Sequence, residues 1–420
     1  MTDLGEEPAG PATRSSVTKV AVATAVSALC GYAVIYLAAR DLAPAGFSVF
    51  GVFWGAFGLV TGAAFGLLQE TTREVRSAPQ LPASAGTPGP HTHPMRVAAV
   101  AGAVAAILIA GSSPLWARQV FAESPRLSVT LLAVGLGGFC LHATLLGTLA
   151  GTNRWSEYGA LMVTDAGFRV VVAVSSVAAG WGLTGFLWAT VAGSAAWLLR
   201  LLGSAPTRTA AQIQTPIKPF DFLRGSAHSV TAAGASSILV MGFPVLLKVT
   251  SPELGATGGV IILAVTLTRA PLLVPLTAMQ GNLIAYFVDQ RRHRVRALVR
   301  PALLVASIGA AGILAAGALG PWLLKVFFGT QYQAGSALLM WLTAGAVSIA
   351  MLTLTGAATV AAALHRAYSL GWVGATLTSG LLLLLPTTLE IRTVVALLCG
   401  PVAGIAVHLV AMARTGDVPG

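Results

Sequence analysis

Three ionisable side chains lie deep within long apolar stretches of the 420-residue chain. Asp165 and Arg169 lie in GALMVTDAGFRVVVAV, and Arg269 lies in ILAVTLTRAPLLVPLTAM. Asp165 and Arg169 are four positions apart, so they share one helix face with the acid N-terminal to the base, the favourable order for an ion pair. Pro271 and Pro275 follow Arg269 and predict a bend that removes helical donors from nearby carbonyl groups. A charge at this depth is costly and therefore indicates function.

These residues point to the binding of an anion. Asp165 can neutralise one of the two arginines, which leaves the other without an acidic partner inside the apolar stretches. Phosphate suits the planar, forked geometry of a guanidinium. We therefore predict Arg269, Arg169 and Asp165 as substrate-binding or gating residues, with a phosphate or diphosphate on a polyprenyl carrier as the ligand. The alternative is a structural ion pair from Asp165 to Arg169 or Arg269 that locks the helices together.

The sequence offers no catalytic constellation. No GxxxxGK[ST] loop is present, and Cys30, Cys140 and Cys399 are scattered through apolar runs. We therefore expect neither a metal nor another cofactor, and we do not expect an enzyme. A membrane glycosyltransferase is a weaker alternative, because it would need an outward-facing acidic site and the acids on the outer segments are few and scattered.

The elements that carry these residues are transmembrane helices. The chain is 55% hydrophobic and 9% charged, with a mean hydropathy of +0.80. Soluble domains carry about 25% charge. Apolar runs of about 20 residues can each cross the membrane as a helix. The predicted fold class is therefore an all-α polytopic membrane protein with about twelve spans. These are 17–39, 47–69, 97–117, 128–150, 159–180, 183–203, 226–248, 257–286, 300–320, 335–360, 367–388 and 393–413.

The cations indicate the orientation. With a cytoplasmic N-terminus, 17 of the 25 Lys and Arg residues fall on inner segments, 6 on outer segments and two within spans. This bias predicts a bacterial cytoplasmic membrane protein with both tails, 1–16 and 414–420, inside, the first of them disordered. The net charge of +11 is then explained by the orientation of the protein in the membrane, and it does not indicate that the protein binds nucleic acid. The basic run 291–300 is expected to contact anionic membrane lipids.

An internal repeat divides the spans into two sets of six. Pro114, Arg118 and Phe121 each lie 207 positions before Pro321, Lys325 and Phe328. Arg40 and Lys248, each followed by proline four positions later, are 208 positions apart. We expect an N-terminal lobe at 17–203, a cytoplasmic linker at 204–225 and a C-terminal lobe at 226–413. Because six is even, a pseudo-twofold axis along the membrane normal should relate the two lobes.

Four cations of this repeat are further candidate residues. Arg40, Arg118, Lys248 and Lys325 all fall on predicted outer loops. They are either a cationic rim around the outer exit of a substrate path or anchors that extend to lipid headgroups.

Two of these loops resemble a known family. YLAARDLAPAGFSVFGVF and GPWLLKVFFGTQYQAGSALL resemble loops of the polysaccharide flippases of the multidrug/oligosaccharidyl-lipid/polysaccharide (MOP) exporter superfamily, with Gly329 and Tyr332 in the expected places. The resemblance implies two six-helix lobes and a flippase that moves a lipid-linked saccharide from the inner to the outer leaflet for envelope polysaccharide assembly. It also implies envelope glycosyltransferases as partners.

The nearer alternative is a multidrug antiporter of the same superfamily. Such proteins bind organic cations and need buried acids, whereas the deep charges here are two arginines and one aspartate. This balance favours an anionic substrate.

Overall fold

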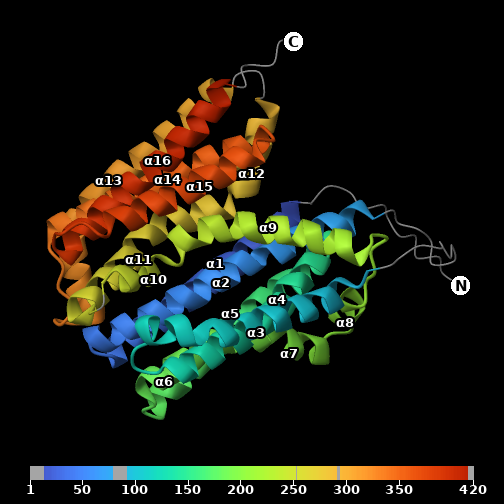
Figure 1. The fold of residues 1–420 in the computed structure, drawn as a ribbon, viewed down its shortest axis with the longest axis horizontal. Helices are drawn as coiled ribbons and strands as arrows, with labels where there is room; N and C mark the ends of the chain where they lie inside the picture. Colours follow the sequence, from blue (N-terminus) through green and yellow to red (C-terminus); the bar gives the residue numbers. More distant parts are fainter. Residues whose placement is uncertain (1–13, 79–91, 252, 291–293, 415–420) are drawn as a thin grey trace, which may run out of the picture.

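The chain folds into helices, as the composition predicts. The computed structural model describes residues 14–78, 92–251, 253–290 and 294–414 (Figure 1). Within these ranges the structure consists of α-helices, one 3-10 turn and an isolated β-bridge between Thr92 and Thr215. The predicted tail residues 1–13 and 415–420 and part of the basic run, residues 291–293, lie outside the described ranges.

The N-terminal half contains six long helical segments and a short helix. They are α1 (Arg14–Asp41), α2 (Pro44–Ser77), α3 (Pro94–Val120), α4 (Pro125–Gly151), α5 (Trp155–Ala178), the segment of α6 (Gly182–Ala192), η1 (Gly193–Ala195) and α7 (Ala196–Gly203), and the short α8 (Ala205–Ala211). Proline begins α2, α3 and α4. Proline suits a first helical position, because its fixed φ fits and the missing amide would have no intrahelical partner there.

The C-terminal half repeats this order with more breaks. It contains α9 (Pro219–Val240), α10 (Phe243–Thr250), α11 (Gly255–Ala278), α12 (Gln280–Asp289), α13 (Arg294–Phe328), α14 (Ser336–Ala361), α15 (His365–Leu382) and α16 (Leu389–Arg414). The predicted linker 204–225 thus includes α8 and the start of α9. The long eighth span, 257–286, continues through Pro271 and Pro275 and breaks at Met279.

Ten described helices are long and apolar enough to cross a membrane, and the α9–α10 pair, bent by 63°, makes an eleventh. The one remaining predicted span, 367–388, corresponds to α15, which has 18 residues and begins with His365 and Arg366. The described residues therefore place a helical segment at every predicted span, and α15 is too polar at its start to pass the same test.

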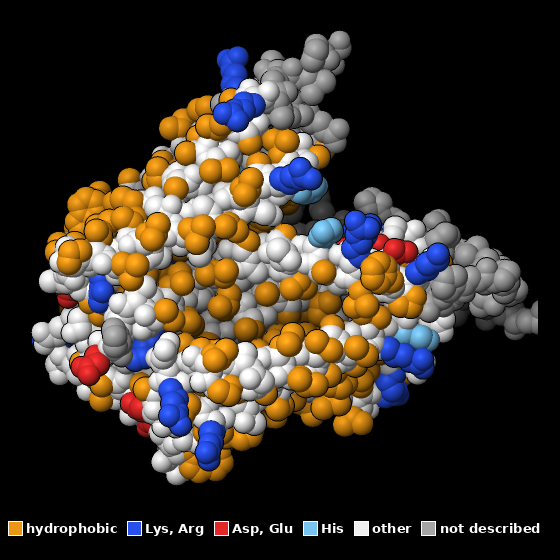
Figure 2. All heavy atoms as spheres, viewed as in Figure 1, with side chains coloured by type: hydrophobic (Ala, Val, Ile, Leu, Met, Phe, Trp, Pro, Cys, Tyr) orange, Lys and Arg blue, Asp and Glu red, His pale blue; other side chains and the backbone are white. Residues whose placement is uncertain are grey.

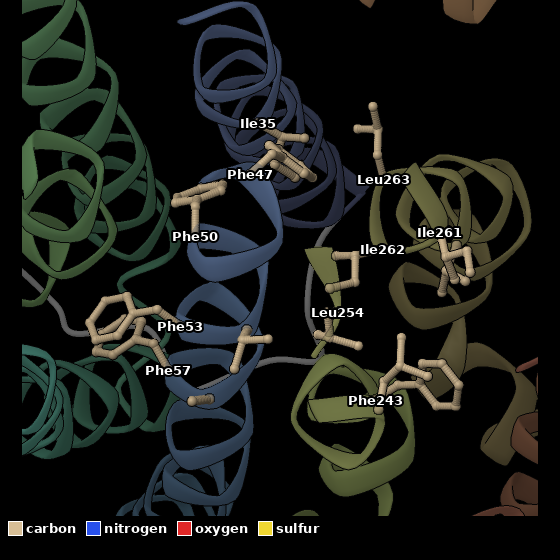
Figure 3. Close-up of a cluster of buried hydrophobic side chains, with 14 of the residues drawn as sticks. Ile35, Phe47, Phe50, Phe53, Phe57, Phe243, Leu254, Ile261, Ile262 and Leu263 are labelled. Carbon is tan, nitrogen blue, oxygen red and sulfur yellow. The ribbon is translucent and has the colours of Figure 1, made fainter. Parts of the chain in front are cut away.

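Helix α2 lies at the centre of the molecule and joins its two halves. It packs against α4 on one side and against α9, α10 and α11 on the other. Glycine makes the close approach possible, since a Cβ on Gly66 would collide with the backbone of Ser229 and Val230. Phe53 and Phe57 extend from one face of α2 toward the rest of the N-terminal lobe. Ile262 of α11 packs near the opposite face of α2 (Figure 3).

The two lobes separate toward one end of the molecule. We name the end where α1 begins and α16 ends the linker end, and the end where α1 joins α2 the closed end. The lobes meet at the closed end and diverge toward the linker end (Figure 1). A hollow lies between them there, with Lys, Arg and His side chains around it (Figure 2).

Candidate functional site

Asp165 and Arg169 form an ion pair within α5. The Nη2 and Nε atoms of Arg169 lie 3.0 Å and 3.2 Å from Oδ1 of Asp165. Both side chains are largely buried, with exposed fractions of 13% for Arg169 and 19% for Asp165. The helical spacing therefore produces the predicted pair.

Arg169 also bridges to two neighbouring helices. Its Nη1 atom donates to the carbonyl oxygen of Thr190, near the end of α6 where the 3-10 turn begins. Its guanidinium carbon lies 5.4 Å from the ring centroid of Phe57 on α2, a cation–π contact. Gly193 makes room for the pair, because a Cβ there would collide with Asp165. The arginine thus satisfies a carbonyl group at a break in a neighbouring helix.

Arg269 makes the corresponding contacts in the other lobe. Its Nη1 atom donates to the carbonyl oxygens of Val240 at 3.0 Å and Leu239 at 3.4 Å. Its guanidinium carbon lies 5.1 Å from the ring centroid of Phe243. Leu239 and Val240 are the last residues of α9, and the backbone amides that follow bond to Ser237 and Gly242 instead. Arg269 therefore caps the broken end of α9, whose last carbonyls have no intrahelical donor.

The two deep arginines differ in how many of their donor atoms have hydrogen-bond partners and in whether an acid neutralises their charge. Arg269 is 7% exposed, and its Nε and Nη2 atoms have no partner among the described residues. None of the ion pairs of the described residues includes Arg269, and Asp165 pairs with Arg169 instead. A buried guanidinium with unpartnered donor atoms is costly, so Arg269 is less well compensated than Arg169.

His142 lies close to the pair in the N-terminal lobe. Its ring stacks on Phe139 with centroids 5.3 Å apart, and its Nδ1 atom has no partner among the described residues. By contrast, His408 is held by Thr355 and the carbonyl oxygen of Tyr368, as a packing histidine should be. His228 is exposed on α9.

The structure brings the two resembling loops together at the closed end. The hydroxyl of Tyr332 donates to the carbonyl oxygen of Leu42 at 3.1 Å, and its ring packs edge-on against Phe47. Phe328 packs edge-on against Tyr36 of α1, with ring centroids 5.9 Å apart. Tyr332 is fully buried. These aromatic contacts join the loop after α13 to the start of the N-terminal lobe.

The four candidate cations all lie at the closed end. Arg40, Arg118, Lys248 and Lys325 each occupy the last turn of a helix, α1, α3, α10 and α13 respectively. Arg40, Arg118 and Lys325 are exposed, and Lys248 is half-buried. Arg40 lies beside Gly329, whose added Cβ would be 3.6 Å from Nη1 of the arginine. Matching positions in the two halves thus carry matching charges.

Sequence reasoning missed two polar contacts between distant segments. Glu70 is buried near the linker end of α2, where Arg73 pairs with it and Ser229 of α9 lies 3.5 Å away. Arg392 donates to Oγ of Ser251 at 2.7 Å, joining α16 to the loop after α10. In the sequence Glu70 is one of several charged residues in the polar stretch QETTREVR. Only its burial against α9 distinguishes it from the other charged residues of that stretch.

Comparison with known sequences finds mycobacterial relatives. No protein-family model matches the chain. Rv3630 of Mycobacterium tuberculosis (strain ATCC 25618 / H37Rv), named an uncharacterized protein, is 70% identical over 408 residues, which cover 97% of this chain and 94% of that protein. Rv1510 of the same strain, also named uncharacterized, is 65% identical over 419 residues, which cover 99% and 96%.

Solved structures share the fold. One described as "Inward-facing conformation of a multidrug resistance MATE family transporter of the MOP superfamily" matches with a TM-score of 0.68 at 14% identity, covering 95% of this chain and 98% of that chain. Its outward-facing counterpart matches with a TM-score of 0.61 at 13% identity, covering 95% and 96%. A MOP superfamily transporter from Pyrococcus furiosus, described as having a binding pocket of reverse polarity, matches with a TM-score of 0.58 at 14% identity, covering 95% and 96%. The fold is that of a MOP superfamily transporter, and these neighbours are transporters and not enzymes.

Proposed function

We propose that this chain, which belongs to the same protein family as Rv3630 and Rv1510 and has a MOP superfamily transporter fold, is a flippase for an anionic, lipid-linked saccharide. Arg269 carries the proposal. It is buried, has no acidic partner among the described residues and keeps two donor atoms free. A phosphate or diphosphate group would supply the missing acceptors and the missing negative charge.

The N-terminal lobe supports the same substrate class. Asp165 is engaged by Arg169, so the deep charges that we assign to the site sum to one positive charge. A site with net positive charge and low-dielectric walls attracts anions. We assign the phosphate to Arg269 and a positioning role to the Asp165–Arg169 pair.

The shape of the molecule suggests how the substrate enters. The lobes meet at the closed end and leave a hollow at the linker end (Figure 2). The excess of cations on the segments of the linker end favours a cytoplasmic location for that end, in the cytoplasmic membrane. The substrate would then enter from the inner leaflet and leave past Arg40, Arg118, Lys248 and Lys325, near the enzymes that assemble envelope polysaccharide.

A multidrug exporter for organic cations is the second candidate. Two of the structural neighbours are described as multidrug resistance transporters. An organic cation needs a buried acid without a cationic partner, and here Arg169 pairs with Asp165 and Arg73 pairs with Glu70. The fold by itself does not distinguish the two substrates, so the charges decide our preference.

Flipping can be measured with the full chain in liposomes. A fluorescent polyprenyl-diphosphate-linked saccharide in the inner leaflet becomes accessible to a membrane-impermeant quencher when it is flipped. Replacing Arg269 with Ala should slow flipping about 10- to 150-fold. This factor corresponds to the loss of one hydrogen bond to a charged group, which contributes about 1.5–3 kcal/mol. Arg269→Lys should recover part of the rate, since the charge remains and the fork is lost.

The matched control is Arg96→Ala, which removes an exposed arginine at the start of α3. It should flip at the wild-type rate. Thermal unfolding in detergent separates a loss of transport from a loss of fold, because Arg269 also caps α9. The proposal is wrong if a folded Arg269→Ala variant flips normally, or if the wild type exports ethidium and leaves the lipid in place.

A further inference from the structure

A groove between α15 and α16 opens on the surface near the linker end. It has a volume of about 930 Å³, which is in the roughly 300–1,000 Å³ range of small-molecule sites. Eight of its eleven lining residues are apolar, among them Leu370, Val407 and Val410. The other three are His365, Arg366 and Arg414. The groove is therefore an apolar trough with a basic end.

The apolar part continues along the exposed face of both helices. On α15, Leu370, Val373 and Leu377 are 62%, 42% and 63% exposed and recur at helical spacing. On α16, Val402 and Val410 are 54% and 48% exposed. In a membrane-spanning protein such a face meets hydrocarbon, so a chain lying in the groove would pass directly into the bilayer core.

The basic end lies where lipid headgroups would be. Arg366 is in the first turn of α15 and Arg414 in the last turn of α16, so both lie at the linker end. None of the ion pairs formed by the described residues includes either arginine. Arg366 sits at a helix start, where the helix dipole disfavours a cation. An anion placed between the two arginines would relieve both charges.

We propose that this groove binds one anionic phospholipid of the bilayer, with its phosphate between Arg366 and Arg414 and one acyl chain along Leu370, Val407 and Val410. A basic pocket between transmembrane helices at the membrane surface suits an anionic headgroup. The length of the apolar wall requires a lipid chain, which free phosphate lacks. The site is separate from Arg269 and does not depend on which substrate is transported.

Native mass spectrometry of the full chain in detergent can test the site. The protein is titrated with dioleoylphosphatidylglycerol, dioleoylphosphatidylcholine or inorganic phosphate. The anionic lipid should bind more tightly than phosphatidylcholine, and inorganic phosphate should not displace it. Arg366→Gln and Arg414→Gln should each weaken binding of the anionic lipid about fivefold. Val410→Trp, which fills the groove, should weaken both lipids.

The matched control is the pair Arg96→Gln and Arg224→Gln, which removes two exposed arginines from the same end, outside the groove and outside the basic run 291–300. It should leave the affinity unchanged. The inference is overturned if the Arg366/Arg414 double variant retains the lipid as the wild type does, or if the control pair weakens binding equally. Displacement of the phospholipid by an equal concentration of polyprenyl phosphate would also overturn it, since the groove would then belong to a transported lipid.

Discussion

Removing one hydroxyl group at the closed end should make that end open more often. The hydroxyl of Tyr332 donates to the carbonyl of Leu42 across the two lobes at 3.1 Å. Tyr332→Phe deletes this bond and preserves the edge-on contact with Phe47. A net hydrogen bond contributes about 0.5–1.5 kcal/mol, so the ratio of open to closed molecules should rise about two- to tenfold.

A larger truncation should have a larger effect. Tyr332 is 0% exposed, so Tyr332→Ala also leaves a cavity, which for an aromatic side chain costs about 3–5 kcal/mol. Burial raises the pKa of the Tyr332 phenol above its usual value. The hydroxyl therefore stays protonated and remains a donor. The effect of Tyr332→Phe on the ratio of open to closed molecules should then be the same between about pH 6 and pH 8.

Labelling of a single cysteine reports the opening. Cys30, Cys140 and Cys399 are first replaced by alanine, and Ala39→Cys then places a thiol at a fully buried position near the end of α1. A membrane-impermeant maleimide added from the outside should react faster in Tyr332→Phe and faster still in Tyr332→Ala. Tyr158→Phe, the same chemical change at the linker end, is the control and should leave the rate unchanged. Equal labelling rates for the wild type and both Tyr332 variants would refute the assignment of these contacts as a closure.

Three further predictions concern the site and the helix packing. Asp165→Asn should destabilise the protein by about 3–5 kcal/mol, measured by thermal unfolding in detergent, because it leaves Arg169 largely buried without its partner; a wild-type melting temperature would contradict the buried pair. Gly66→Ala should destabilise it by about 1–3 kcal/mol through a collision with α9, whereas Gly111→Ala, with nothing within 4 Å of the new Cβ, should be tolerated; equal effects would contradict the close packing of α2. Arg40→Gln combined with Lys325→Gln should slow flipping in the liposome assay if these cations form an exit rim, and an unchanged rate would favour anchors for headgroups.

The positions of the spans follow from local properties of the chain. Each apolar run crosses the membrane by its own length and composition, so α1 to α5 can be predicted from the sequence one at a time. The Asp165–Arg169 pair is predictable for the same reason, because four residues on a helix always bring two side chains to one face. The matching cations of the two halves were also visible as a repeat.

The contacts of Arg269 depend instead on how distant helices pack. The span 226–248 is predicted as one helix, but the structure bends it by 63° at Met241 and Gly242, just before Pro244. The freed carbonyls of Leu239 and Val240 become acceptors for Arg269 only because α11 packs beside that bend. Likewise, Tyr332 meets Leu42 across 290 residues of sequence. The sequence shows which charges lie within apolar spans, but the partner of each charge depends on which helices lie side by side, a property of the whole packed chain.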